Sequence, residues 1–88
     1  MGRYRILIKR SAAKELEAIS TKKLRQQIVR KIDALSDTPR PRDCQKLSGQ
    51  DRYRLRQGDY RIVYEIRDRE LVVFLVKVGH RREVYRNP

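Results

Sequence analysis

The fold of this chain is most readily inferred from YRLRQGDYRIVYEI, Tyr53 to Ile66. Its apolar residues recur at every second position on both sides of Gln57-Gly58, which is the period of a β-strand. Gln57-Gly58 can supply a tight turn, so the stretch predicts a β-hairpin. Asp68-Arg69 offers another turn, and the apolar run Leu71 to Val76 then predicts a third, central strand of a meander.

The first half of the chain changes from a strand period to a helix period. Arg3 to Lys9 alternates like a short strand, and Ser11 is expected to be the N-cap of a first helix. Ser20-Thr21 is expected to separate that helix from a second, longer one. The apolar positions at helical spacing are Ala12, Ala13, Leu16, Ile19, Leu24, Ile28, Ile32 and Leu35. Thr38-Pro39-Arg40-Pro41 cannot continue a helix, so a loop is expected to reach about Gly49. We therefore expect an α+β fold in the order βααβββ, with an antiparallel sheet and two N-terminal helices packed on one face.

Length and charge limit the class of protein. The 88 residues predict a single domain over 1–88, and 23 Lys and Arg against 11 Asp and Glu give a net charge of +12. Such a charge favours a polyanion or a strongly acidic protein as partner. The sequence has no long apolar run, signal peptide or lipidation motif, so we expect a cytoplasmic protein without a membrane partner. One cysteine, Cys44, and one histidine, His80, allow neither a disulfide framework nor a zinc site.

The arginines of the hairpin are the unusual feature of the sheet. With Gln57-Gly58 as the turn, Arg54 lies opposite Arg61, and Arg52 lies on the same face. Like charges directly opposite each other destabilise a sheet by up to about 1 kcal/mol, so an external anion such as phosphate is expected to compensate. The alternatives are a shifted register, or pairing of these arginines with a carboxylate from Asp51, Asp59 or Glu65.

The second helix carries further cations on its other faces. We interpret them as a solvated helix surface and assign them no specific role. They are Lys22, Lys23, Arg25, Arg30 and Lys31.

Three segments in this order resemble a known family. KLSG at Lys46 to Gly49, the hairpin stretch, and VGHRREVYR at Val78 to Arg86 together resemble the RelE/ParE superfamily of toxin-antitoxin toxins, most closely the RelE-type mRNA interferases. The resemblance implies a toxin that enters the ribosomal A site and cleaves mRNA there without a metal or other cofactor. It also implies neutralisation by an acidic RelB-like antitoxin, with operator DNA bound only through the antitoxin complex.

The resemblance also implies site residues. Arg54, Arg61 and Arg81 match the basic catalytic positions of RelE-type enzymes, and Tyr85 matches their near-terminal catalytic tyrosine. Metal-free cleavage needs a base for the 2'-OH, cations around the phosphorane and an acid for the leaving 5'-oxygen. Tyr85 can act as the base if neighbouring arginines lower its pKa. Further substrate contacts are expected from Lys46, Arg52, Arg56, His80 and Arg82.

The residues alone leave some assignments open. Either Arg81 or Arg82 could be the phosphate ligand, and His80 competes for an acid or base role. Arginine is a poor proton donor, so the acid has no good candidate. The alternative functions are a ParE-type toxin acting on DNA gyrase and a non-catalytic RNA-binding module; Tyr85 together with the arginine face favours RNA cleavage.

Overall fold

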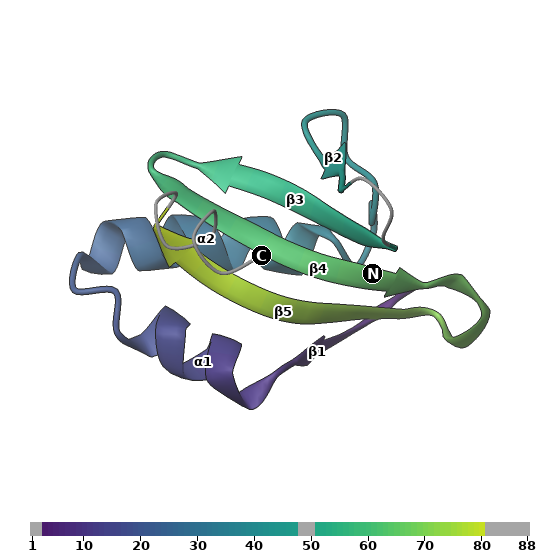
Figure 1. The fold of residues 1–88 in the computed structure, drawn as a ribbon, viewed down its shortest axis with the longest axis horizontal. Coiled ribbons are helices and arrows are strands. Elements are labelled where there is room, and N and C mark those ends of the chain that lie inside the picture. Colours follow the sequence, from purple (N-terminus) through teal and green to yellow (C-terminus); the bar gives the residue numbers. More distant parts are fainter. Residues whose placement is uncertain (1–2, 48–50, 81–88) are drawn as a thin grey trace.

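The chain forms a five-stranded sheet with two helices on one side (Figure 1). The computed structural model describes residues 3–47 and 51–80. The elements are β1 (Arg5–Ile8), α1 (Arg10–Glu17), α2 (Lys22–Ala34), β2 (Gln45–Lys46), β3 (Arg52–Gln57), β4 (Tyr60–Arg67), the 3-10 helix η1 (Asp68–Glu70) and β5 (Val72–His80). The α+β class and the expected order are confirmed. The short strand β2 is an addition, because it lies within the segment expected to be a loop.

The strand order is β1-β5-β4-β3-β2, with β4 in the centre. Strands β3, β4 and β5 form the expected antiparallel meander. The added strand β2 pairs antiparallel with β3, whereas β1 pairs with β5 in parallel. The prediction of a purely antiparallel sheet is therefore wrong for β1. Parallel pairing requires a long crossover between the two strands, and here α1, α2 and the β3–β4 hairpin provide it.

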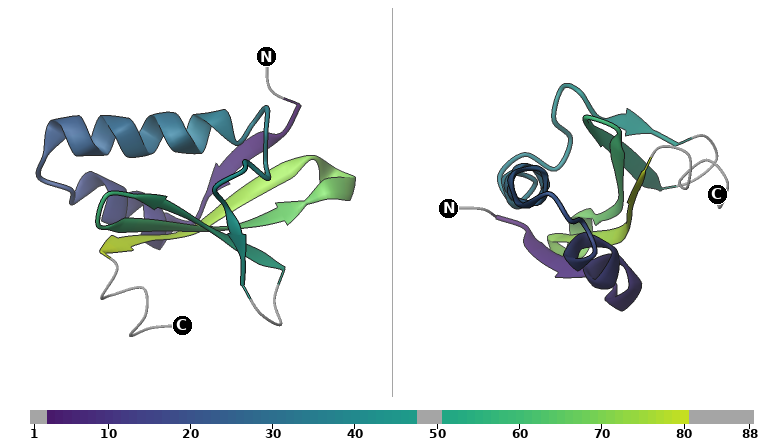
Figure 2. Two further views of the ribbon diagram at one scale, coloured as in Figure 1. Left: turned by 90° about the horizontal axis from the view of Figure 1, so that it is seen from above. Right: turned by 90° about the vertical axis from the view of Figure 1, so that its left-hand side faces the viewer.

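The helices and the sheet enclose one hydrophobic core, and the helices lie on a single side of the sheet (Figure 2). Buried side chains of the helices meet those of β3, β4 and β5; they are Ala12, Ile19, Ile28, Ile32, Leu35, Leu55, Ile62, Tyr64, Ile66, Val73, Leu75 and Val78. Burial of each large apolar side chain contributes about 1.5 to 3 kcal/mol. Because the core uses only one face of the sheet, side chains on the opposite face are available to bind a ligand.

The first helix begins two residues earlier than its sequence indicates. Lys9 is the N-cap residue, without a side-chain cap, and Ser11 lies inside the first turn, so the prediction of Ser11 as N-cap is wrong. The backbone N–H of Lys9 donates to the carbonyl of Leu75 at 2.9 Å, which holds Lys9 on the sheet while the chain turns into α1 at Arg10.

In residues 3–47 and 51–80, the helices are too short or too polar to span a bilayer.

The β3–β4 turn lies one residue later than expected. Gly58 and Asp59 form it, and Gly58 has φ of +59°, a left-handed conformation that suits glycine. Arg56 consequently faces Arg61, and Arg54 faces Val63, so the predicted opposition of Arg54 and Arg61 is wrong. Each residue of β3 therefore pairs with a residue of β4 two positions further along the chain than expected. Since side chains alternate with a period of two, all these arginines keep their predicted face.

The β4–β5 connection differs more from the expected two-residue turn. It is the 3-10 helix η1 followed by Leu71 in a left-handed conformation with φ of 53°. Leu71 therefore lies outside β5, which begins at Val72. A two-residue turn at Asp68-Arg69 would place Val76 opposite Arg61. The longer connection, together with a register shift between Val63 and Tyr64, places Gly79 there instead.

Candidate active site

A basic cavity lies beside the tip of the β3–β4 hairpin. Its volume is about 410 Å³, and its walls come from α2, from the segment ahead of β3 and from the hairpin. The lining residues are Lys31, Asp43, Gln45, Arg54, Arg56 and Arg61. Four of them are cations and one is a carboxylate. This excess of positive charge in a concave site favours an anion such as a phosphate group.

Arg61 is the most buried charged residue of the cavity, with 4% of its surface exposed. Its Nη1 donates to the carbonyl oxygens of Gly58 and Tyr60, each at 3.1 Å. These neutral acceptors orient the guanidinium without cancelling its charge. Arg56 lies directly opposite on β3, so two cations share this end of the sheet. A guanidinium held this way has little water to screen it and can stabilise a bound anion.

The other cavity residues are held by short polar contacts. Nη2 of Arg54 donates to Oε1 of Gln45 at 2.5 Å, which ties β3 to β2. Lys31 reaches over from α2, and its Nζ donates to Oδ2 of Asp43 at 3.1 Å and to the carbonyl of Arg56 at 2.8 Å. The hydrogen bond from Lys31 lowers the pKa of Asp43. The carboxylate of the cavity is thus bonded to Lys31.

The expected substrate contacts separate into two groups. Arg56 joins Arg54 and Arg61 at the cavity, whereas Lys46, Arg52 and His80 do not line it. Nε of Arg52 donates to Oε2 of Glu65 at 3.2 Å, directly across the β3–β4 pair. The charge of Arg52 therefore has an internal partner, as one of the sequence alternatives proposed. His80 packs edge-on against Tyr60, with the ring centroids 5.9 Å apart.

Three predicted residues of the C-terminal segment, Arg81, Arg82 and Tyr85, lie outside the described residues. β5 ends at His80, and Gly79 faces Arg61 across the β4–β5 pair. The last described residues of β5 therefore run beside the hairpin end of the sheet.

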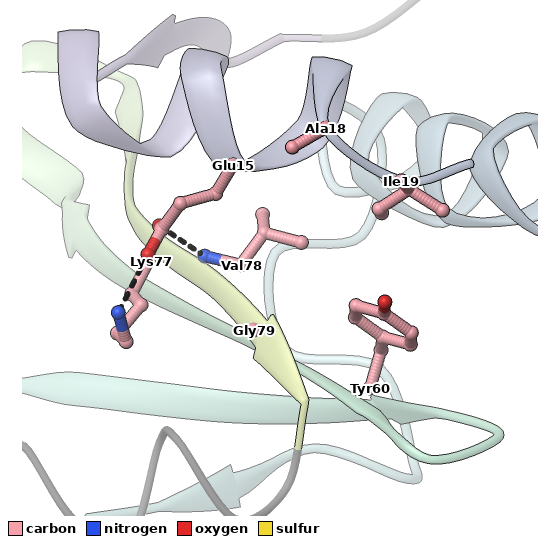
Figure 3. A pocket seen from close by; sticks show the side chains of 7 residues that line it. All are labelled: Glu15, Ala18, Ile19, Tyr60, Lys77, Val78 and Gly79. Carbon is pink, nitrogen blue, oxygen red and sulfur yellow. Dashed lines mark hydrogen bonds and ion pairs between the residues drawn. The ribbon is translucent and has the colours of Figure 1, made fainter.

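A second cavity of about 490 Å³ lies between the end of α1 and the end of β5 (Figure 3). The carboxylate of Glu15 accepts hydrogen bonds there from Nζ of Lys77 at 2.6 Å and from the backbone N–H of Val78 at 3.1 Å. This part of β5 pairs with β4 on one side, but β1 ends at Ile8 and does not reach it on the other. Glu15 takes the place of a strand partner on that open side. Its single cation and single carboxylate are paired, so this cavity is less suited to a phosphate than the basic one.

A third group of polar residues lies at the opposite end of the sheet. Arg40 donates to both carboxylate oxygens of Asp68, at 2.8 and 3.2 Å, and to the hydroxyl of Tyr53 at 3.1 Å. The hydroxyl of Tyr4 also donates to Asp68, at 2.7 Å. The hydrogen bonds from Arg40 and Tyr4 lower the pKa of Asp68 to about 2. This turn-end cluster joins the N-terminus, the loop after α2 and η1.

Sequence reasoning missed the cavity residues that lie outside the hairpin, namely Lys31, Asp43 and Gln45. Lys31 was expected to be a solvated helix cation, and no spacing in the chain connects it with Arg56, 25 residues away. Residues 3–47 and 51–80 contain no cluster of three His, Cys, Asp or Glu side chains that could hold a metal ion.

Comparison with known proteins identifies the family. Residues 6–85 match the family described as the ParE toxin of the type II toxin-antitoxin system parDE. The mRNA interferase toxin RelE of Escherichia coli is 36% identical over 67 residues, which cover 70% of each chain. The chain belongs to the RelE/ParE superfamily of type II toxins.

Solved structures of this superfamily share the fold. The archaeal RelE–RelB complex from Pyrococcus horikoshii has a chain that matches with a TM-score of 0.81 at 32% identity, covering 90% of this chain and 96% of its own. The intact RelBE toxin-antitoxin complex of Escherichia coli matches with a TM-score of 0.75 at 32% identity, covering 88% and 95%. The chain is therefore most similar to the RelE-type members, as its motifs predicted.

Proposed function

We propose that this toxin is an endoribonuclease that cleaves mRNA in the ribosomal A site without a metal ion, and so inhibits translation. The observation that carries the proposal is the basic cavity, in which buried Arg61 is oriented by neutral carbonyl oxygens beside Arg54 and Arg56. A phosphorane gains negative charge as it forms, and preorganised cations in a poorly solvated site stabilise that charge. The mRNA interferases among its relatives support the same activity.

The proposed reaction assigns a role to each group. Arg54 and Arg61 bind the scissile phosphate, and Arg81 or Arg82 completes the clamp from the C-terminal segment. Tyr85 accepts the 2'-OH proton, because its arginine neighbours favour the phenolate. The further substrate contacts, among them Arg56, bind neighbouring phosphates of the message.

The proposed partners follow from charge and family. A chain with net charge +12 is suited to an acidic protein, and the relatives of known structure include RelE toxins bound to RelB antitoxins. We infer that a RelB-like acidic antitoxin neutralises this toxin in the cytoplasm and that operator DNA is bound only through their complex. A small adjacent reading frame that encodes an acidic helical protein is the expected genetic counterpart.

The test is to add the purified toxin to a translating system and to map new 5' ends on the message by primer extension. Cleavage is expected on ribosome-bound mRNA, with little on the same RNA free in solution. Unchanged messages under both conditions would refute the ribonuclease proposal.

A second candidate function rests on the family match, since the matching description is that of ParE toxins. ParE-type toxins are expected to act on DNA gyrase. A supercoiling assay with the same toxin preparation separates the two candidates: inhibited supercoiling with intact messages would favour the ParE-type function.

A further inference from the structure

Cleavage of mRNA requires a general acid, and none of the residues assigned above fills that role. When the 2'-oxygen attacks phosphorus, the bond from phosphorus to the 5'-oxygen breaks, and the departing oxygen needs a proton. The arginines of the cavity are poor donors, because guanidinium has an ordinary pKa above about 12. An ammonium group loses a proton more readily, and the described cavity contains one, that of Lys31.

We propose that Lys31 is the general acid that protonates the 5'-oxygen leaving group. This inference rests on the proposed ribonuclease function and goes beyond it by naming the proton donor. Lys31 lies on α2, and its Nζ reaches the cavity wall formed by Arg54, Arg56 and Arg61. No sequence motif includes this lysine, since it comes to the cavity only through the packing of α2 on the sheet.

The contacts of Lys31 suit a donor. An ammonium has three N–H groups, and two of them are donated to Asp43 and to the carbonyl of Arg56. These two contacts fix the position of Nζ. The third N–H has no acceptor within residues 3–47 and 51–80, so it can donate to a substrate oxygen. About a third of the side chain, 33%, is exposed, so a bound message can reach it. The charge of Asp43 keeps the ammonium in place between turnovers.

The proposed step accounts for every proton moved and every bond formed or broken. The 2'-OH proton passes to the base, the 2'-oxygen bonds to phosphorus, and the bond between phosphorus and the 5'-oxygen breaks. Lys31 gives one proton to the 5'-oxygen and becomes a neutral amine. The products are a 2',3'-cyclic phosphate and a 5'-hydroxyl, and solvent returns the proton to Lys31 before the next turnover.

The test compares two leaving groups. One message carries the natural linkage at the mapped cleavage position, and the other carries sulfur in place of the bridging 5'-oxygen. A thiolate leaves without protonation, because an ordinary thiol has a pKa of about 8.5. Single-turnover cleavage of both messages is measured on ribosomes with the wild type, Lys31→Met and Lys31→Arg. Lys23→Met, which changes an exposed lysine of α2 outside the cavity, is the matched control.

Both Lys31 variants are expected to cleave the natural message about 10² to 10⁴ times more slowly, the range typical of a lost general acid. On the sulfur message they are expected to approach the wild-type rate, and Lys23→Met is expected to match the wild type on both. Lys31→Arg keeps a cation and hydrogen-bond donors at this position, so it separates proton donation from charge and from folding.

Either of two results would overturn the assignment of Lys31 as the general acid and leave the proposed ribonuclease function intact. One is an equal loss on both messages, which would indicate binding or folding; the other is a full rate for Lys31→Arg on the natural message, which would indicate that charge suffices. A wild-type toxin that cleaves neither message on ribosomes would overturn the proposed function itself, and this assignment with it.

Discussion

The two ends of the sheet use arginine in opposite ways. At the hairpin end, Arg54, Arg56 and Arg61 line a cavity that they share with one carboxylate, Asp43, which is bonded to Lys31. At the turn end, Arg40 holds both oxygens of Asp68. The residue type is the same, and its partner decides its role. An arginine bonded to a carboxylate joins segments of the fold, whereas one oriented by carbonyl oxygens keeps its charge for a ligand.

Arg52 shows the same rule within a single strand. It lies on the outer face of β3 together with Arg54 and Arg56. Unlike them, it lies opposite Glu65 and forms an ion pair with it. Ion pairs of this partly exposed kind contribute about 0 to 1 kcal/mol. Arg52 is therefore structural in its resting contacts, although its position in sequence is like that of the cavity arginines.

The largest effect that separates the two ends is expected for Arg61→Ala. Removal of a preorganised charge donor from such a site typically lowers kcat by about 10² to 10³-fold, and we expect a loss of that size in mRNA cleavage on ribosomes. Arg40→Ala, at the turn-end cluster, is the matched control and is expected to stay within a few-fold of the wild type. The measurement is the single-turnover cleavage rate of purified variants.

Folding has to be monitored alongside, because Arg61 is buried. The urea midpoint of each variant identifies a change that acts through stability. If a folded Arg61→Ala protein cleaves at the wild-type rate, or if Arg40→Ala loses as much activity, the distinction between the two ends is wrong.

A smaller effect, on stability only, is expected for Tyr64→Phe. The Tyr64 side chain is fully buried, and its hydroxyl donates to the carbonyl of Pro39 at 2.9 Å, just ahead of Arg40. Burial also raises the pKa of Tyr64, which keeps the hydroxyl protonated as a donor. Loss of the donor leaves the carbonyl without its partner, at a cost of about 1 to 3 kcal/mol in the free energy of unfolding.

Urea unfolding followed by circular dichroism measures this loss. Tyr4→Phe removes an exposed hydroxyl from the turn-end cluster and is expected to cost less. Cleavage by Tyr64→Phe should stay near the wild-type rate under conditions where the protein is folded. A large loss of activity in a folded Tyr64→Phe protein would mean that the loop after α2 also shapes the basic cavity.

The face of the sheet was predictable, while its exact pairing was not. A period of two fixes which residues share a face, so the outer position of Arg52, Arg54 and Arg61 follows from the sequence. The turn could be placed at either Gln57-Gly58 or Gly58-Asp59, because one glycine serves both. Only the structure shows that Gly58 takes the left-handed position and that Arg56 faces Arg61.

The composition of the cavity was less predictable than the fold. Lys31 and Asp43 come from separate segments, and the packing of α2 on the sheet brings them to the hairpin. A single sequence carries no local pattern for such a contact. The register shift between β4 and β5 was equally unpredictable. An apolar run does not indicate which of its residues will lack a partner on the neighbouring strand.

The smallest effect is the pH dependence of the turn-end cluster. The pKa of Asp68 is about 2 in the folded protein, below the ordinary value of about 3.9, because Arg40 and Tyr4 bind the carboxylate. A depressed pKa means that this carboxylate contributes stability above about pH 4 and that the contribution is lost as the pH falls through 2.

Asp68→Asn keeps an acceptor oxygen but removes the charge, so its urea midpoint should lie below that of the wild type at pH 7. The difference should narrow steadily between pH 4 and pH 2, and it should be weaker at high salt because the pair is exposed. Arg40→Gln removes the main cause of the shift and should bring the titration of Asp68 closer to its ordinary range. A difference between wild type and Asp68→Asn that stays constant down to pH 2 would show that the charge of Asp68 does not hold this end of the sheet, and the contrast with the basic cavity would then rest on the hairpin alone.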